Sequence, residues 1–183
     1  MEHTAVVVTA SDGAAAGTRD DESGPVVAEL LTGAGLRVVG RVTVPDERNE
    51  IAALLRRLAE DDVSLVAVTG GTGFGPRDVT PEATRDVMER EAPGLAEAMR
   101  AAGRAITPMA DLSRGVFGVR GRTLIVNLPG SPKGATESLE AVLGVLGHAL
   151  DLVTGHTRQH PPGHGEDGHA ERGDRTAHDH PPL

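Results

Sequence analysis

The sequence predicts a three-layer α/β fold, in which helices cover both faces of a mostly parallel central sheet and a small β-hairpin is added. Short runs of β-branched residues alternate with segments of helical apolar spacing, which is the pattern of consecutive βαβ units. A chain of 183 residues also fits one domain and a short remainder, because a domain takes roughly 150 residues. We therefore expect a single hydrophobic core.

The first half of the chain is predicted to form a βαβαβ unit. Apolar, β-branched runs indicate strands over residues 4–9, 37–44 and 63–68. Helical spacing indicates helices over 25–31, ending near Gly33 or Gly35, and over 46–61, with a loop over 11–22. Parallel strands joined by right-handed crossovers bring their carboxyl ends to one edge, where such sheets bind ligands.

The second half continues with helices and a hairpin. Helices are expected over 81–90 and 94–102, hairpin strands over 116–119 and 123–127, and a last helix over 133–153. Between Ala141 and Val153 the last helix is apolar nearly all round. A helix with so little polar surface is covered on more than one side, which indicates an oligomer.

The composition changes sharply after Gly155. Residues 156–183 contain six of the eight histidines, four prolines and five acidic residues, while Leu183 is the only apolar residue there larger than alanine. Such a segment buries too little surface to offset its ordering entropy. We expect one folded domain over residues 1–155 and a disordered His/Pro-rich tail over 156–183.

Composition also excludes several functions. The net charge is −9, and Phe74 and Phe117 are the only aromatic residues, so neither a basic stripe nor a stacking platform favours nucleic acid as a partner. The absence of cysteine excludes disulfides, thiol nucleophiles and zinc-thiolate sites. No basic secretory start and no long apolar run are present, so we expect a cytoplasmic protein that does not span a membrane.

A glycine-rich loop follows the third predicted strand. The loop residues are Gly70, Gly71, Thr72, Gly73 and Gly75. Backbone N–H groups without Cβ obstruction can converge on a phosphate in such a strand–loop–helix context. Pro76 and Arg77 replace the Lys-Ser/Thr of a P-loop, and the glycine spacing does not match a dinucleotide-binding fingerprint. The loop predicts a phosphate site of another kind, with a plain tight turn as the alternative.

Two aspartates follow strands at the same edge. Asp46 comes after the second strand, and Asp78 lies next to the glycine loop, so both carboxylates are candidates to hold a divalent cation. Asp46 has an alternative role as a helix N-cap. Asp78 can instead pair with Arg77 or Arg85, since the N-cap position before Pro81 belongs to Thr80.

Further polar residues lie at other strand ends. Ser131 precedes Pro132 and is a predicted N-cap, which makes a second anion-accepting helix start. Lys133 is the only lysine, and its compact charge suits a phosphate, although chance placement explains it as well. Ser11 and Asp12 follow the first strand, next to an acidic loop that is otherwise a solvated surface.

Together these segments resemble the molybdopterin adenylyltransferase family, the MogA/MoaB-like proteins that include the gephyrin G domain. The long segment 69–83 (TGGTGFGPRDVTPEA) is the most specific. The others, in order, are 8–12 (VTASD), 21–25 (DESGP), 44–46 (VPD), 113–114 (SR) and 127–133 (NLPGSPK).

The resemblance implies a homotrimeric α/β enzyme of molybdenum cofactor biosynthesis. Such an enzyme binds Mg²⁺, ATP and molybdopterin, transfers AMP to the terminal phosphate of the pterin and releases pyrophosphate. The resemblance assigns catalysis and the metal to Asp46 and Asp78. It assigns nucleotide and phosphate binding to Ser11, Asp12, Gly70, Gly71, Thr72, Gly73 and Gly75, and the pterin or phosphate pocket to Ser113, Arg114, Pro129, Gly130, Ser131 and Lys133.

Phosphoryl-type transfer suits this composition, because it requires position and charge neutralisation rather than a cysteine or tyrosine nucleophile. The alternative function is a non-catalytic molybdopterin-binding or delivery protein of the MoaB type.

Overall fold

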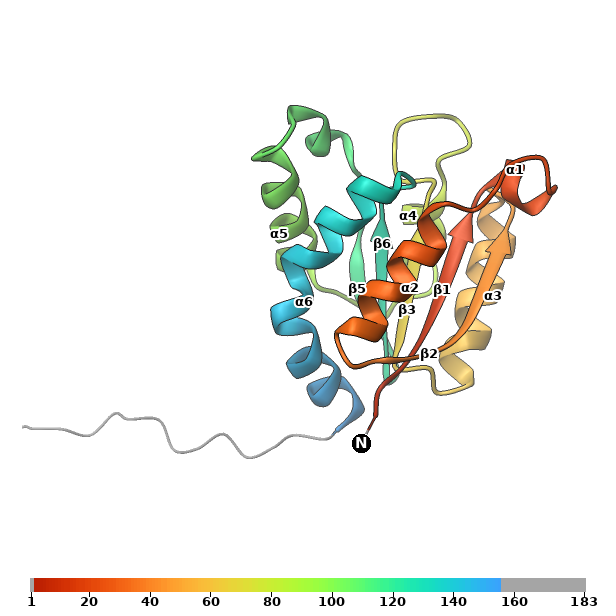
Figure 1. The fold of residues 1–183 in the computed structure, drawn as a ribbon. Coiled ribbons are helices and arrows are strands. Elements are labelled where there is room, and N and C mark those ends of the chain that lie inside the picture. The colour runs from red at the N-terminus through yellow and green to blue at the C-terminus, as the bar shows by residue number, and fades with distance from the viewer. Residues whose placement is uncertain (1, 156–183) are drawn as a thin grey trace, which may run out of the picture.

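The computed structural model describes residues 2–155, so the predicted disorder of 156–183 lies outside the described residues. Within the described part, one sheet of six strands forms the centre (Figure 1). The strands are β1 (Thr4–Ala10), β2 (Arg37–Val44), β3 (Leu65–Thr69), β4 (Arg90–Glu91), β5 (Phe117–Arg120) and β6 (Thr123–Leu128). No helix of residues 2–155 combines the length and apolar character needed to cross a membrane.

The sheet order is β2-β1-β3-β6-β5-β4. The four strands β2, β1, β3 and β6 run parallel, whereas β5 pairs antiparallel with β6 and β4 antiparallel with β5. Every residue of β3 and β6 is buried, as expected for parallel strands covered on both faces. The predicted α/β class, mostly parallel sheet and β5–β6 hairpin are confirmed.

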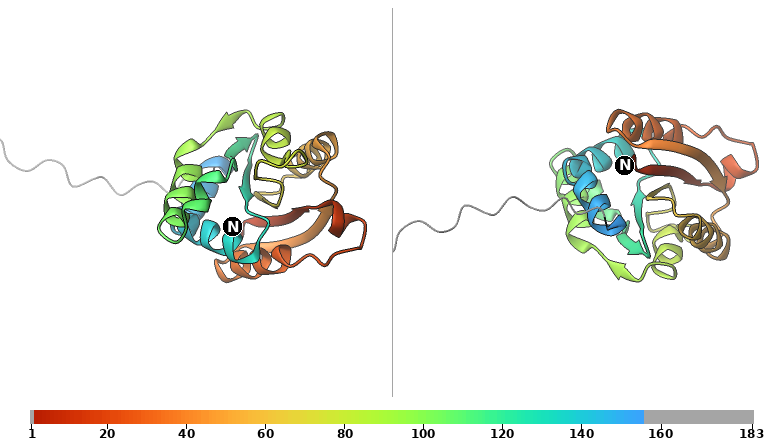
Figure 2. Two further views of the ribbon diagram at one scale, coloured as in Figure 1. Left: turned by 90° about the horizontal axis from the view of Figure 1, so that it is seen from above. Right: turned by 90° about the horizontal axis from the view of Figure 1, so that it is seen from below.

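Helices cover both faces of this sheet (Figures 1 and 2). The helical segments are α1 (Asp12–Ala15), α2 (Ser23–Gly33), α3 (Arg48–Glu60), α4 (Thr80–Arg85), α5 (Pro93–Arg104), a 3₁₀ turn η1 (Pro108–Leu112) and α6 (Pro132–Thr154). One core cluster joins α2, α5 and α6 to the sheet, and it includes the buried side chains of Phe117, Leu139 and Leu146. The second joins α3 and α4 to the opposite face through Ile51, Leu55 and Ala83.

Three elements differ from the predictions. The helix predicted over 81–90 ends at Arg85, because the following residues turn into β4, an edge strand that pairs with Val119 and Gly118. The loop predicted over 11–22 contains the short helix α1. The helix predicted from Asp46 starts at Arg48 with Glu47 as its N-cap residue, so the N-cap alternative for Asp46 is wrong.

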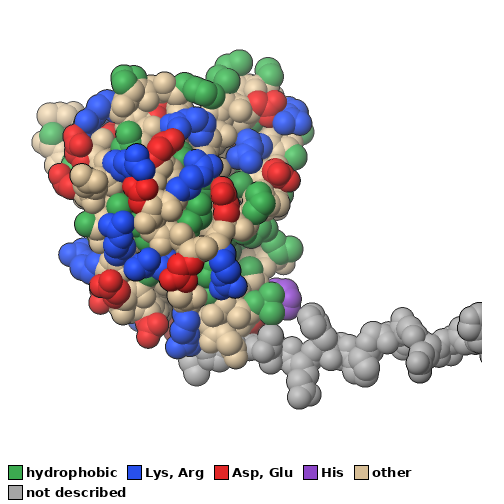
Figure 3. Space-filling view, turned by 180° about the vertical axis from the view of Figure 1, so that it is seen from behind, with side chains coloured by type: hydrophobic (Ala, Val, Ile, Leu, Met, Phe, Trp, Pro, Cys, Tyr) green, Lys and Arg blue, Asp and Glu red, His purple; other side chains and the backbone are tan. Residues whose placement is uncertain are grey.

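The surface away from the viewer in Figure 1 carries acidic and basic side chains side by side (Figure 3). One of the ion pairs in the described residues is the two-pronged contact of Arg48 with Asp86, at 2.6 and 2.7 Å. Exposed pairs of this kind add little to stability. The fold therefore depends mainly on the two apolar clusters that hold the helices against the sheet.

Candidate functional site at the carboxyl edge of the sheet

Four loops meet at the carboxyl edge of the parallel strands. They follow β1, β2, β3 and β6, and they begin at Ser11, Pro45, Gly70 and Pro129. Ser11 N donates to the carbonyl of Val44, and Gly70 N donates to the carbonyl of Leu128, so neighbouring loops are joined where they leave the sheet. The predicted residues after each strand therefore lie along one rim.

Asp12 and Asp46 hold each other in place across this rim. The backbone N–H of Asp12 donates to Asp46 Oδ2 at 2.9 Å, and the N–H of Asp46 donates to Asp12 Oδ1 at 3.0 Å. These reciprocal bonds join the loops after β1 and β2. Each is a charge-assisted hydrogen bond, which is shorter and stronger than a neutral one.

Arg77 ties a third loop to this pair. Its Nε and Nη2 donate to the carboxylate of Asp12 at 3.0 and 2.9 Å, and its Nη1 donates to Glu47 at 2.7 Å. The hydrogen bond from Arg77 lowers the pKa of Asp12. The alternative in which Arg77 or Arg85 pairs with Asp78 is wrong, because Arg77 binds Asp12 and Glu47, while Arg85 binds Glu91.

Asp46 keeps one carboxylate oxygen without a hydrogen-bond partner. Its Oδ1 is buried, and so is the equally unpartnered hydroxyl of Thr80. The two oxygens lie 3.2 and 2.5 Å from the point that a Cβ on Gly71 would occupy. Burial raises the pKa of Asp46, with the charges of Asp12 and Asp78 acting in the same direction. Buried polar atoms without partners are rare, and they often mark an absent water or ion.

Thr80 does not act as the predicted N-cap. It is the first residue of α4, where Val79 is the N-cap residue and Pro81 stands in the first turn. Its side chain faces Gly71 and is fully buried. The hydroxyl is therefore part of the rim rather than a helix cap.

The glycine loop wraps closely around Asp78. Asp78 Oδ2 accepts from Gly75 N at 2.6 Å, and a Cβ on Gly73 or Gly75 would come within 2.9 or 2.8 Å of that oxygen. Gly70 and Gly71 have φ angles of 94° and 60°, which favour glycine. These glycines allow the loop to fold tightly enough to place a carboxylate beside the rim.

Two cavities open next to the rim, and Ser131 lines both. The first has a volume of about 380 Å³ and includes Ser11, Gly70, Gly71 and Gly130 in its lining. The second has a volume of about 280 Å³, is mostly apolar, and includes Thr72, Gly73, Ser113 and Pro129 in its lining. A polar and an apolar compartment thus meet at the start of α6.

Ser131 and Lys133 differ in their placement. Ser131 is the N-cap of α6, where its hydroxyl accepts from Gly134 N at 3.2 Å, as predicted. The side chain of Lys133 is 78% exposed, and its Nζ lies 3.7 Å from Glu137 Oε1. Lys133 lines neither cavity, so contact with a phosphate would require its side chain to turn back over the helix start.

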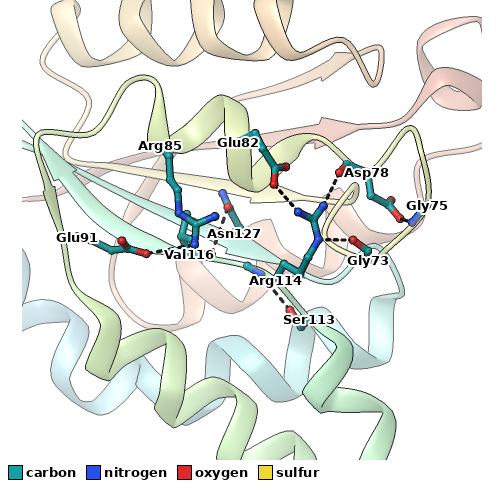
Figure 4. A network of polar contacts seen from close by, with 11 residues as sticks. Gly73, Gly75, Asp78, Glu82, Arg85, Glu91, Ser113, Arg114, Val116 and Asn127 are labelled. Atoms are coloured by element: carbon teal, nitrogen blue, oxygen red, sulfur yellow. Dashed lines mark hydrogen bonds and ion pairs between the residues drawn. The ribbon is translucent and has the colours of Figure 1, made fainter.

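Arg114 stands between Ser113 and Gly115, which line the apolar cavity, and its side chain reaches Gly73 and Asp78 (Figure 4). Its guanidinium donates to the carbonyl oxygens of Gly73 and Asp78, at 2.6 and 2.5 Å, and also to Glu82. The Phe74 ring lies 5.8 Å from the same group. Burial alone would raise the pKa of Glu82, but the hydrogen bond and the charge of Arg114 lower it overall.

Sequence reasoning gave no role to several residues that build the site, although it placed the acidic loop with Asp21 at the same edge. Asp21 accepts from Thr9 Oγ1 and Gly24 N, both at 2.9 Å, and so fixes the acidic loop beside the first cavity. The sequence did contain a signal for this bond, namely an aspartate three residues before a glycine at the start of a helix, where the side chain can accept from the backbone N–H. Met99, Arg100 and Met109 of α5 and η1 line the apolar cavity. No local pattern indicated them, because their contact with the strands depends on packing between distant segments.

This architecture defines an α/β protein with a ligand site at the carboxyl edge of its sheet, made of two compartments and a carboxylate rim. Residues 6–148 match the family described as "Probable molybdopterin binding domain". The chain is 40% identical to a molybdopterin adenylyltransferase of Helicobacter pylori J99, over 84% of this chain and 89% of that protein. It is also 41% identical to the Drosophila melanogaster molybdenum cofactor synthesis protein cinnamon, over 80% of this chain but 25% of that longer protein.

Solved structures agree with this relationship. The molybdopterin biosynthesis enzyme MoaB of Thermus thermophilus superposes with a TM-score of 0.80 at 55% identity, covering 84% of this chain and 97% of that one. The molybdopterin biosynthesis Mog protein of Mycobacterium ulcerans gives a TM-score of 0.79 at 42% identity, covering 85% and 99%. The chain belongs to the molybdopterin-binding domain family of molybdenum cofactor biosynthesis.

Proposed function

We propose that this protein is a molybdopterin adenylyltransferase. In this reaction an oxygen of the terminal phosphate of molybdopterin attacks the α-phosphorus of ATP, and the bond from that phosphorus to the β-phosphate oxygen breaks. The products are adenylylated molybdopterin and pyrophosphate. The observation that carries this proposal is the meeting of two compartments at Ser131, next to the rim that bears Asp46 and Asp78.

The two compartments suit the two substrates. We assign the nucleotide to the polar cavity, with Ser11, Gly70 and Gly71 in its wall and Asp12 on the adjoining rim. We assign the pterin to the mostly apolar cavity, where Ser113, Pro129 and Ser131 offer a few polar groups among apolar ones, as small-molecule sites do. Thr72 and Gly73 in the wall of the apolar cavity and Gly130 in the wall of the polar one complete the proposed binding set. We add Gly75 and Lys133 to this set, although neither residue lines one of these two cavities.

The residues on the rim fit Mg²⁺. This ion prefers oxygen ligands, and it commonly uses one or two carboxylates, several waters and the phosphates of a substrate. The unpartnered Oδ1 of Asp46 and the nearby carboxylate of Asp78 are such ligands. The described residues contain no group of three or more metal-binding side chains. When bound, Mg²⁺ would neutralise charge on the reacting phosphates.

The chain's own residues position the reaction. We assign phosphate oxygens to N–H groups of residues 71–73, because those of Gly70 and Gly75 donate to Leu128 and Asp78, and the N-terminus of α6 places further donors where the compartments meet. The loops after β1, β2 and β3 are held together through Asp12, Asp46 and Arg77, which fixes the arrangement of the rim. Catalysis would come from alignment and charge neutralisation rather than from a covalent intermediate.

A product assay tests the proposal. Purified protein with ATP, Mg²⁺ and molybdopterin is expected to form adenylylated pterin and pyrophosphate, identified by mass. Asp78→Asn is expected to bind molybdopterin with nearly unchanged affinity but to lower product formation by about 10²-fold or more, because it removes a preorganised charge from the transfer site. Wild-type turnover in Asp78→Asn would contradict the assignment. Pterin binding without product from the wild-type protein would favour the non-catalytic, MoaB-type binding or delivery function.

We include a homotrimer in this proposal. Val145 and Leu152 of α6 remain 51% and 52% exposed, which supports coverage of this helix by a second copy of the chain. The native mass in solution, measured by light scattering at several protein concentrations, is expected to correspond to three chains. A monomer at all concentrations would contradict this part of the proposal.

A further inference from the structure

The segment around Arg114 contacts the apolar cavity and the glycine loop at once. Ser113 and Gly115 line the cavity, and the backbone N–H of Arg114 donates to the carbonyl of Thr72 at 2.9 Å. The Arg114 side chain leaves this wall and enters the loop that carries Asp78 (Figure 4). One short segment therefore forms a wall of one compartment and a support of the rim.

The guanidinium of Arg114 joins the two ends of the segment 73–78. Nε donates to the carbonyl of Gly73 at its start, and Nη2 donates to the carbonyl of Asp78 at its end. Nη1 donates to Glu82 in the first turn of α4, which anchors the loop to that helix. All three nitrogens thus have protein acceptors, and the side chain is only 28% exposed.

The Asp78 carboxylate depends on this loop for its orientation. Its hydrogen bond within the described residues comes from Gly75, which belongs to the same loop. Asp46, in contrast, is held by a residue from another loop, Asp12. The position of Asp78 relative to Asp46 is consequently determined by the shape of the segment 73–78, and Arg114 bridges the two ends of that segment.

We propose that Arg114 is a positioning residue that sets Asp78 against Asp46, rather than a contact of pterin or phosphate. This role in catalysis depends on the proposed AMP transfer. A planar guanidinium with a fixed fork of donors can bond two carbonyls and a carboxylate simultaneously, whereas a lysine ammonium cannot reproduce that geometry. Arg114→Lys keeps the charge and removes the fork, and it therefore separates positioning from simple charge.

A double-mutant cycle tests the role through activity. We expect Arg114→Lys to lower kcat for AMP transfer on the order of 10²-fold, as for a small misplacement of a reacting group, while KM for molybdopterin changes less than about threefold. In the Asp78→Asn background the same change should cost less than about threefold, because the group that it positions is already lost. The proposal would be overturned if Arg114→Lys raised the KM for molybdopterin and if its loss of kcat multiplied with that of Asp78→Asn, because both results together would show direct contact of Arg114 with the substrate.

A second measurement needs no substrate. Amide hydrogen exchange over residues 73–78 is expected to be faster in Arg114→Lys than in the wild-type protein, while the thermal midpoint shows that the fold persists. Arg120→Lys is the matched control, since Arg120 also donates to a backbone carbonyl, that of Val87 at 3.0 Å, away from the rim. Unchanged exchange over 73–78 would refute the role of Arg114, even if the wild-type protein formed no adenylylated pterin.

Discussion

Asp46→Asn is expected to lower AMP transfer to molybdopterin by about 10²–10³-fold and to leave the folded state at least as stable at neutral pH. The loss of activity follows from the loss of a charged oxygen at the rim. Asparagine retains a carbonyl oxygen that can accept from the N–H of Asp12, and its neutral amide avoids the burial of a charge. The folded state is thereby retained, while the charge that the metal and phosphates require is lost.

The pKa of Asp46 gives the sign of the effect on stability. Burial raises this pKa in the folded state above the value in the unfolded chain. The folded protein therefore binds the proton more tightly, and the resulting stabilisation is present below the unfolded pKa and lost as pH rises through the folded pKa. At neutral pH the ionised carboxylate is penalised, and asparagine removes that penalty.

Urea unfolding of both proteins at pH 7 and pH 4, together with the product assay, checks this prediction. The stability advantage of Asp46→Asn should be larger at pH 7 than at pH 4. Asp86→Asn is the control, because the pKa of Asp86 is shifted in the opposite direction from that of Asp46. The hydrogen bond from Arg48 lowers the pKa of Asp86, so the ionised carboxylate stabilises the fold at pH values above the pKa of this residue in the unfolded chain. Asp86→Asn should lose only a little stability at pH 7, because the pair is exposed, and it should retain activity. Wild-type activity in Asp46→Asn would remove this carboxylate from the mechanism.

Gly70→Ala is expected to destabilise the fold by about 2–5 kcal/mol and to abolish substrate binding. At a φ of 94° an alanine is strained by roughly 1–2 kcal/mol, and overpacking adds roughly 1–3 kcal/mol. A Cβ on Gly70 would overlap the carbonyl oxygen of Ala10, a backbone atom at the end of β1 that has no freedom to move aside. Gly130 closes the other side, since a Cβ there would come 3.2 Å from the Cα of Gly70.

Gly35→Ala is the control that measures the backbone strain of alanine at a positive φ without a steric overlap of the added Cβ. Gly35 has a φ of 87°, close to that of Gly70, but no atom lies within 4 Å of the position of its added Cβ. Chemical unfolding should therefore show a loss of about 1–2 kcal/mol for Gly35→Ala and a clearly larger loss for Gly70→Ala. Equal losses would mean that the contact between the loops after β1 and β3 does not limit this position.

The sequence predicted best those elements whose residues show a local period. The strand over 37–44 and the start of the last helix after Ser131 were predicted closely, because alternation, apolar spacing and capping are visible in a few consecutive residues. The helix over 81–90 was predicted too long, since its end is determined by pairing of residues 90 and 91 with β5. Pairing partners that are distant in sequence leave no mark on the local period.

In the candidate site, too, local patterns predicted some features, whereas others depend on contacts between distant residues. The glycine loop, the two aspartates and Ser131 could be named from turn chemistry and strand ends, and the structure brings the strand ends that carry them to one edge. The partner of Arg77 could not be predicted, because Asp12 and Glu47 are 65 and 30 residues away in sequence. Arg114 was assigned to the pterin pocket by resemblance, whereas its side chain spans the glycine loop.

The amino-acid sequence by itself determined the α/β class, the order of the longer strands and helices, and the kinds of side chains that follow each strand. These properties depend on hydrophobic periodicity, glycine conformations and helix capping, which act over a few residues. Only the tertiary structure decided which arginine holds which carboxylate, which oxygen of Asp46 is without a partner, and that two cavities meet at Ser131. Those relations come from contacts between loops that are far apart in the sequence, and packing between distant segments is not encoded in any local pattern.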